Sequence, residues 1–173
     1  MSTRLPQLIN GEFQQSRTDT WIPVTNPATQ EVLCEVPAAT AEEMESAIQS
    51  AREAFLEWRE TPVSERARGM LRYQHLLKEH HDEIAEVLAK ETGKVFADAK
   101  GDVWRGIEVV EFACGIPNLL KGEFTGEVGS GVDSFSMRSP VGVCAGITPF
   151  NFPAMVPMWM YPLSIACGNT FVL

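Results

Sequence analysis

The chain has 173 residues, enough for one ordinary domain, and a formal net charge of −9. This acidic balance argues against nucleic acid or an anionic membrane as a partner. The four cysteines are far apart and form no C-x-x-C pair, which argues against a metal centre and favours reduced cytosolic thiols. The opening residues, Met1 to Pro6, lack the apolar run of a signal peptide, so a cytoplasmic location is expected.

The first part of the chain, residues 7–36, is expected to form short β-strands. Asn10-Gly11 is a tight-turn dipeptide between two short apolar runs, which predicts a hairpin. Residues 26–29, Asn-Pro-Ala-Thr, predict a second turn, and residues 31–36 follow as another strand.

Helical stretches come next. Thr40 with Glu43 three positions later forms a capping box, and Pro62 is expected to end the helix that it starts. A second helix is predicted from Ser64; it breaks at residues 80–82, resumes, and is expected to stop at Gly93. A long helix is then predicted from apolar residues spaced by three or four: Val95, Ala99, Val103, Ile107, Val110 and Cys114.

The segment after residue 121 changes in character. Residues 122–131 are Gly-rich and are expected to be a connector, whereas residues 134–138 alternate polar and apolar side chains and predict a half-exposed strand. Residues 141–147 indicate a buried strand that leads into a loop ending at Pro153, a residue that suits the first turn of a further helix. Helices followed by one βαβ-like unit place the chain in the α/β class.

Residues 139–173 contain no Asp, Glu, Lys or Arg. An uncharged segment of this length belongs in a protein core or in lipid. Prolines interrupt every candidate membrane span, so a buried strand, a short helix and a second strand are the favoured interpretation. The sequence stops at a strand-like stretch, Gly168 to Leu173, and we expect the chain to be the front part of something larger.

The loop at residues 148–153 is the candidate functional site, because ligands of open α/β sheets bind at the carboxyl ends of strands. The flat faces of Phe150 and Phe152 are suited to line a nucleotide site. The Asn151 amide could donate to an oxyanion that develops on a substrate carbonyl. The alternative is that Asn151 caps the next helix as a buried turn amide, and spacing alone favours that alternative.

Other chemistry-bearing residues give weaker signals. His80 and His81 are adjacent, so on a helix they point in different directions and cannot chelate a metal; a solvated helix end is their expected role. The sequence has no G-x-S-x-G elbow, no G-x-G-x-x-G after a strand and no Walker motif. The tryptophans of the helical stretches are expected in the core: Trp58, Trp104 and Trp159.

Several motifs together resemble the opening of the aldehyde dehydrogenase superfamily. They follow that family's order over nearly the whole chain: Ile9-Asn10-Gly11-Glu12-Phe13, Thr25-Asn26-Pro27-Ala28-Thr29, Glu91-Thr92-Gly93-Lys94, Pro140-Val141-Gly142-Val143, Pro149-Phe150-Asn151-Phe152-Pro153 and Gly168-Asn169-Thr170. Many hydrolytic members have Trp before the loop's Asn, whereas this chain has Phe150. That residue, the run from Cys144 to Pro157, and residues 71–74 and 101–106 resemble the CoA-acylating branch that acts on methylmalonate and malonate semialdehydes.

The resemblance implies the N-terminal part of the aldehyde dehydrogenase fold, an incomplete α/β structure. It would comprise a β-hairpin, helices, an oligomerisation strand and the first strands of a Rossmann-like NAD-binding sheet. Residues 1–131 would be strands and helices of the NAD-binding domain, residues 132–140 a bridging strand that assembles a homo-oligomer, expected to be a tetramer, and residues 141–173 the truncated first βαβ part of the sheet.

The resemblance also implies a reaction. A Cys thiolate attacks the aldehyde, hydride passes to NAD, and the thioester loses CO2 and is transferred to coenzyme A, giving propionyl-CoA or acetyl-CoA in valine, pyrimidine or inositol catabolism. Asn151 would stabilise the oxyanion, and Thr148, Pro149 and Phe150 would lie against NAD. The nucleophilic Cys would lie beyond Leu173, because no cysteine here matches its surroundings. Residues 1–173 alone are therefore expected to be inactive.

Two other functions stay open at this point. One is a hydrolytic aldehyde dehydrogenase that releases a free acid with the help of a Glu base. The other is a non-catalytic truncated product that only binds a partner.

Overall fold

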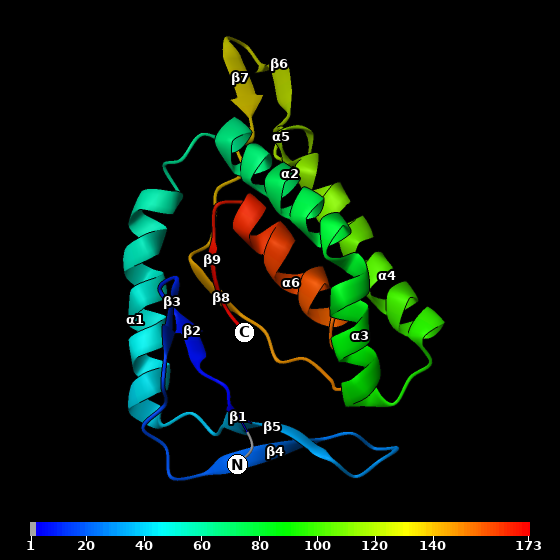
Figure 1. Cartoon of the computed structure of the whole chain (residues 1–173). Coiled ribbons are helices and arrows are strands. Elements are labelled where there is room, and N and C mark those ends of the chain that lie inside the picture. Colours follow the sequence, from blue (N-terminus) through cyan, green and yellow to red (C-terminus); the bar gives the residue numbers. More distant parts are fainter. Residues whose placement is uncertain (1–2) are drawn as a thin grey trace.

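Helices packed side by side form the core of the structure, a computed structural model that describes residues 3–173 (Figure 1). The chain is mixed α/β, as expected. The packed helices are α2 (Val63–Glu79), α3 (His81–Thr92), α4 (Phe96–Cys114), the short α5 (Ile116–Leu119) and α6 (Met155–Ala166). The first helix, α1 (Ala41–Trp58), lies on the other side of a small parallel sheet.

The centre of the core is α4, whose apolar spacing is confirmed. Ala99, Val103, Ile107 and Val110 are fully buried, and they contact apolar side chains of α2, α3 and α6 such as Leu77, Leu88 and Met158. A β-carbon at Gly106 would lie only 2.4 Å from Met158 Cε, so α4 and α6 approach each other closely because this position has no side chain.

The N-terminal strands confirm the predicted β-structure. A hairpin joins β2 (Gln7–Ile9) to β3 (Glu12–Gln14), and both turn residues, Asn10 and Gly11, have positive φ. A separate sheet has the order β1-β5-β4, with β1 (Thr3–Arg4), β4 (Trp21–Thr25) and β5 (Val32–Pro37). Its β4–β5 connection is the predicted Asn-Pro turn, in which Asn26 Oδ1 accepts the N–H of Ala28 at 2.9 Å.

The local stop and start signals act close to where they were predicted. The Thr40–Glu43 capping box is present at the start of α1, and Gly93 ends α3 in the left-handed conformation with φ of 73°. Pro62 is the N-cap of α2 rather than the end of α1, because α1 already stops at Trp58.

The Gly-rich segment at 122–131 is not a connector; that prediction is wrong. It contains β6 (Phe124–Gly129), which pairs antiparallel with β7 (Val132–Phe135) in a protruding hairpin (Figure 1). The strand predicted at 134–138 accordingly ends earlier, at Phe135. All residues of both strands are exposed, so neither strand needs the alternation that a half-buried strand shows.

The uncharged tail forms the small parallel sheet. Its strands β8 (Val143–Ala145) and β9 (Thr170–Val172) pair in register, and α6 connects them. The expected burial is wrong around β8: Val141 and Ile147 are 86% and 96% exposed, because no segment among residues 3–173 covers that face. No helix of the described chain is both long and apolar enough to cross a membrane.

Two further expectations fail in this region. Trp104 and Trp159 are nearly half exposed rather than core residues, since each lies on the outward side of its helix. Pro153 precedes α6 instead of occupying its first turn, because the helix begins only at Met155.

Candidate functional site

The candidate loop, residues 148–153, lies within the connection between β8 and α6, and it passes close to the junction of α3 and α4 (Figure 1). Thr148 is half-buried, Pro149 is exposed, and Phe150 is 94% exposed. Asn151 is exposed and its side-chain amide makes no hydrogen bond to residues 3–173. The proposed site residues thus lie together on one open loop with their polar and aromatic groups available to a ligand.

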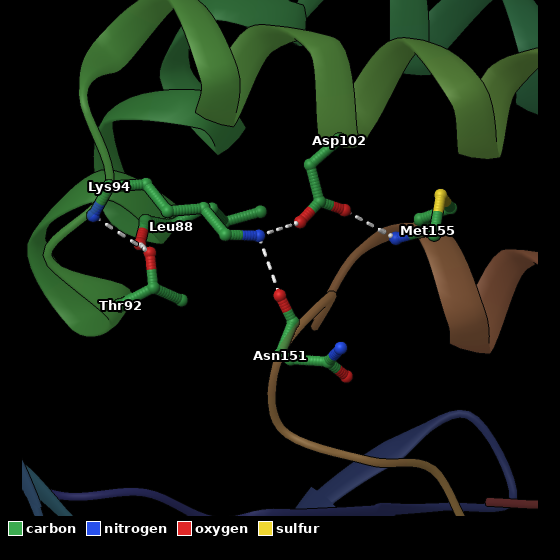
Figure 2. Close-up of polar contacts among 6 residues, drawn as sticks. All are labelled: Leu88, Thr92, Lys94, Asp102, Asn151 and Met155. Carbon is green, nitrogen blue, oxygen red and sulfur yellow. Dashed lines mark hydrogen bonds and ion pairs between the residues drawn. The ribbon is translucent and has the colours of Figure 1, made fainter.

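The capping alternative for Asn151 is contradicted. Helix α6 begins at Met155 with Ala154 as its N-cap, and no side chain of the cap residue bonds to it. The first N–H of the helix, that of Met155, instead donates to Asp102 Oδ1 at 2.8 Å (Figure 2). A carboxylate from α4 therefore supplies the cap that α6 lacks locally.

A lysine in the middle of the α3–α4 connection, Lys94, bonds to the backbone of the candidate loop. Lys94 Nζ donates to Asp102 Oδ2 at 2.9 Å and to the backbone carbonyl oxygen of Asn151 at 2.6 Å. The same ammonium lies 4.1 Å from the centre of the Phe152 ring, a cation–π contact. Figure 2 shows the Asn151 carbonyl turned toward Lys94 while the side-chain amide extends away from it.

Local sequence explains how Lys94 reaches this position. Gly93 reverses the chain at the end of α3. Its φ is positive, and a residue with a side chain would be strained in this conformation. The Thr92 hydroxyl donates to the Leu88 carbonyl at 2.8 Å and accepts the Lys94 N–H at 3.3 Å, which fixes the turn (Figure 2).

The Lys94–Asp102 pair is largely shielded from water. The Asp102 side chain has no exposed surface, and that of Lys94 is 23% exposed. A buried carboxylate is tolerated only when it is paired and hydrogen-bonded, and Asp102 has both an ammonium and a backbone N–H as partners. The pair thus joins the α3–α4 connection, α4 and the start of α6 into one polar cluster.

Sequence reasoning did not single out this pair. Lys94 and Asp102 entered only as members of family-like motifs, and no role was predicted for either. One signal was available: Asp102 lies on the apolar stripe of α4, beside Val103 and between Ala99 and Gly106. A charge on a buried helical face requires a partner.

The strand before the loop is also held in place by an amide. Asn169 Oδ1 accepts the N–H groups of Val141 and Gly142 at 2.7 and 3.0 Å, and Asn169 Nδ2 donates to the Ser164 carbonyl at 3.1 Å. Asn169 is buried, and its three bonds fix the start of β9 against both the chain that leads into β8 and helix α6.

Three of the four cysteines lie in surroundings that disfavour an activated nucleophile. Burial raises the pKa of the Cys34, Cys114 and Cys167 thiols, which disfavours the thiolate. For Cys167 the nearby Arg66 opposes this effect without overcoming it. Among residues 3–173 no group of His, Cys, Asp and Glu side chains is arranged to hold a metal ion.

Comparison with known proteins identifies the family. The model of the Aldehyde dehydrogenase family matches residues 13–173. The chain belongs to this family. It is 50% identical over 173 residues to the mitochondrial, acylating methylmalonate-semialdehyde dehydrogenase of Arabidopsis thaliana, covering all of this chain and 28% of that protein. It is also 50% identical over 172 residues to malonate-semialdehyde dehydrogenase 1 of Geobacillus kaustophilus, covering 99% and 35%.

Solved structures of the aldehyde dehydrogenase family agree with the fold. The methylmalonate-semialdehyde dehydrogenase of Oceanimonas doudoroffii superposes with a TM-score of 0.95 at 50% identity, covering all of this chain and 35% of that one. Lactaldehyde dehydrogenase of Escherichia coli gives 0.92 at 29% identity, covering 99% and 36%. This aldehyde dehydrogenase chain therefore spans about a third of the length of the relatives it matches.

Proposed function

We propose that this chain is the N-terminal part of an NAD-dependent, CoA-acylating semialdehyde dehydrogenase. The whole enzyme would oxidise methylmalonate semialdehyde, and malonate semialdehyde, to propionyl-CoA or acetyl-CoA with loss of CO2. The observation that carries this proposal is 50% identity along the entire chain to relatives named for these substrates, against 29% to a lactaldehyde dehydrogenase. Phe150, where many hydrolytic members have Trp, also favours the acylating branch.

We propose that residues of the loop hold a nicotinamide cofactor. The Thr148 hydroxyl has no hydrogen-bond partner within residues 3–173, and the Phe150 ring offers an open apolar face beside Pro149. We propose these three residues as part of the NAD site, and a related Sinorhizobium meliloti structure was solved with NAD. NAD, when bound, accepts the hydride from the substrate carbon.

We propose that the Asn151 amide donates to the oxyanion formed when a thiolate adds to the aldehyde carbonyl. Its N–H donors are not used inside the described chain, and the loop backbone that carries it is fixed by Lys94. A donor held in place before the reaction stabilises charge that develops in the transition state without reorganising at that moment.

The remaining assignments are parts of the same proposal. The nucleophilic Cys lies outside residues 1–173, and coenzyme A is the acyl acceptor. Residues 1–131 and 141–173 belong to the NAD-binding domain, and residues 132–140 bridge subunits of a homo-oligomer, together with β6, which pairs with β7. The cytoplasmic location stays a prediction; the Arabidopsis relative is named mitochondrial.

The test of this function uses the full-length enzyme. NADH formation from methylmalonate semialdehyde is followed with and without CoA, and the products are identified by mass spectrometry. We expect propionyl-CoA as the product and a rate that depends on CoA. Methylmalonate or propionate released at a CoA-independent rate would contradict the acylating reaction and support the hydrolytic alternative, and no NADH with either semialdehyde would contradict both.

A further inference from the structure

We propose that Lys94, held by Asp102, is a positioning residue for the Asn151 amide. This inference rests on the proposed role of Asn151 and adds a residue to which neither a role nor a contact with substrate has been assigned. Lys94 would act through the loop backbone, without touching the reacting atoms.

The first argument is the contact itself. Lys94 Nζ donates to the carbonyl oxygen of Asn151, the same residue whose side chain is the candidate oxyanion donor, at 2.6 Å. Fixing that carbonyl fixes the plane of the following peptide and restricts the backbone from which the amide side chain extends. Within residues 3–173 the Asn151 side chain has no bond of its own, so its position depends on the backbone.

The second argument is that the loop is held at two points by one ion pair. Asp102 accepts the Met155 N–H with one oxygen and the Lys94 ammonium with the other, at 2.8 and 2.9 Å. Both ends of the 151–155 segment are therefore tied to α4. The Phe152 ring between them lies against the same ammonium, 4.1 Å from its centre.

The third argument is the cost of this arrangement. A fully buried carboxylate is rarely the most stabilising choice on the apolar face of a helix, because both charges must leave water. A cap for α6 needs only one oxygen, and a neutral side chain could supply it. The lysine adds the bond to Asn151, which a cap alone does not explain.

The energetic consequence follows from how steeply catalysis depends on geometry. A misplacement of about 1 Å by a change remote from the reacting atoms can cost about 100-fold in rate. Without Lys94 the Asn151 carbonyl loses its partner and the loop is tied at Met155 only. Hydride transfer should then slow while binding of NAD, which uses neighbouring side chains, changes little.

The test is a double-mutant cycle in the full-length enzyme. We expect Lys94→Met to lower the single-turnover rate of hydride transfer by about tenfold to 100-fold and to change the Kd of NAD by less than about threefold. In an Asn151→Ala background the same Lys94→Met change should have almost no further effect, because the amide that it positions is missing. Full, multiplicative losses in the double variant would overturn the proposal.

Two additional variants separate positioning from folding. Lys94→Met leaves Asp102 buried and unpaired, so the combined Lys94→Met/Asp102→Asn variant removes the charge while keeping an acceptor for Met155; it should be folded and should stay slow. Lys94→Arg retains the cation and should recover part of the rate. A charge-neutral double variant with wild-type hydride transfer would show that Lys94 only balances Asp102.

The matched control is Lys100→Met. Lys100 also pairs with an aspartate, Asp82, at 2.7 Å and also lies over an aromatic ring, but it is on the outer side of α4 and away from the loop. This control should keep its hydride-transfer rate.

A readout without catalysis keeps the two proposals apart. Amide deuterium exchange of residues 147–155 should rise in Lys94→Met and not in Lys100→Met, whatever reaction the enzyme catalyses. Unchanged exchange in Lys94→Met would refute the positioning role. Faster exchange in an enzyme without acylating activity would refute the proposed function alone.

Discussion

The carboxylate of Asp102 accepts the backbone N–H of Met155 across 2.8 Å, so a side chain of α4 caps α6. We predict that Asp102→Ala destabilises the protein by about 3–5 kcal/mol, because it leaves the partly buried Lys94 ammonium and the Met155 N–H without their partner. Urea unfolding of the full-length variant and wild-type enzymes measures the difference in their free energies of unfolding. Asp82→Ala is the matched control, since Asp82 forms a surface ion pair with Lys100 and should cost much less. Similar losses in both variants would contradict the role of Asp102.

Glu43 should make stability depend on pH. Hydrogen bonds from the Thr40 and Arg17 N–H groups and from Ser16 lower the pKa of this carboxyl below its ordinary value. The unfolded chain therefore binds the proton more readily than the folded one. The contribution of Glu43 is fully present above about pH 4.3, the ordinary glutamate value, and is lost as the pH falls through the lowered pKa of the folded state.

The measurement is the difference in Tm between wild type and Glu43→Ala. We expect it to be largest near neutral pH and to shrink at acidic pH. Glu45→Ala, which changes an exposed carboxylate on the same helix, is the matched control. A difference that grows toward low pH would contradict the sign of the prediction.

The β6–β7 hairpin is predicted to assemble the oligomer. Phe124 and Phe135 face each other across its strands and are 70% and 68% exposed, an apolar surface that favours a partner. Phe135→Lys in the full-length enzyme should shift sedimentation toward smaller species, whereas Phe135→Tyr, which keeps the ring, should not. An unchanged mass in Phe135→Lys would place the interface elsewhere.

A polypeptide of residues 1–173 is predicted to be inactive and prone to aggregation. Ile147 and Phe150 are almost fully exposed, and within residues 3–173 strand β9 pairs on one edge only, with β8. A groove of about 1010 Å³ with mostly apolar walls lies between α1, β2 and β9. An open apolar surface of this kind also favours aggregation. Light scattering and an NADH assay against the full-length enzyme check both parts; a monodisperse, NADH-producing sample would contradict them.

Three signals that act within a few residues were read correctly from the sequence, whereas Pro62 and Pro153 were each placed in the wrong part of a helix. The Asn10-Gly11 turn, the Thr40–Glu43 capping box and the stop at Gly93 each depend on neighbours in the chain, so their physics is complete in a short window. The buried stripe of α4 was also predictable, because an apolar period of three to four residues defines the helical face that the core covers.

Features that depend on distant partners were missed. Strand β6 pairs with β7 and has no buried face. Its Gly-rich sequence therefore lacks the alternation of polar and apolar residues that would have predicted a strand. The exposure of Trp104 and Trp159 depends on which helical faces find neighbours. For the site, the family resemblance favoured Asn151 as an oxyanion donor over a helix cap, and that role stays a prediction. The contact between Asn151 and Lys94 joins residues 57 positions apart and carries no local signature.

The Lys94–Asp102–Asn151 contacts also constrain the order in which the protein can fold. They join positions separated by 8 and 57 residues, so the loop-closure entropy of the longer contact must be overcome before it forms. Helices α3 and α4 can pack through nearby contacts, whereas the bond between Lys94 and Asn151 needs a part of the chain 57 residues further on. During synthesis, Lys94 would leave the ribosome well before Asn151. The ion pair between Lys94 and Asp102 could therefore form before the bond between Lys94 and Asn151.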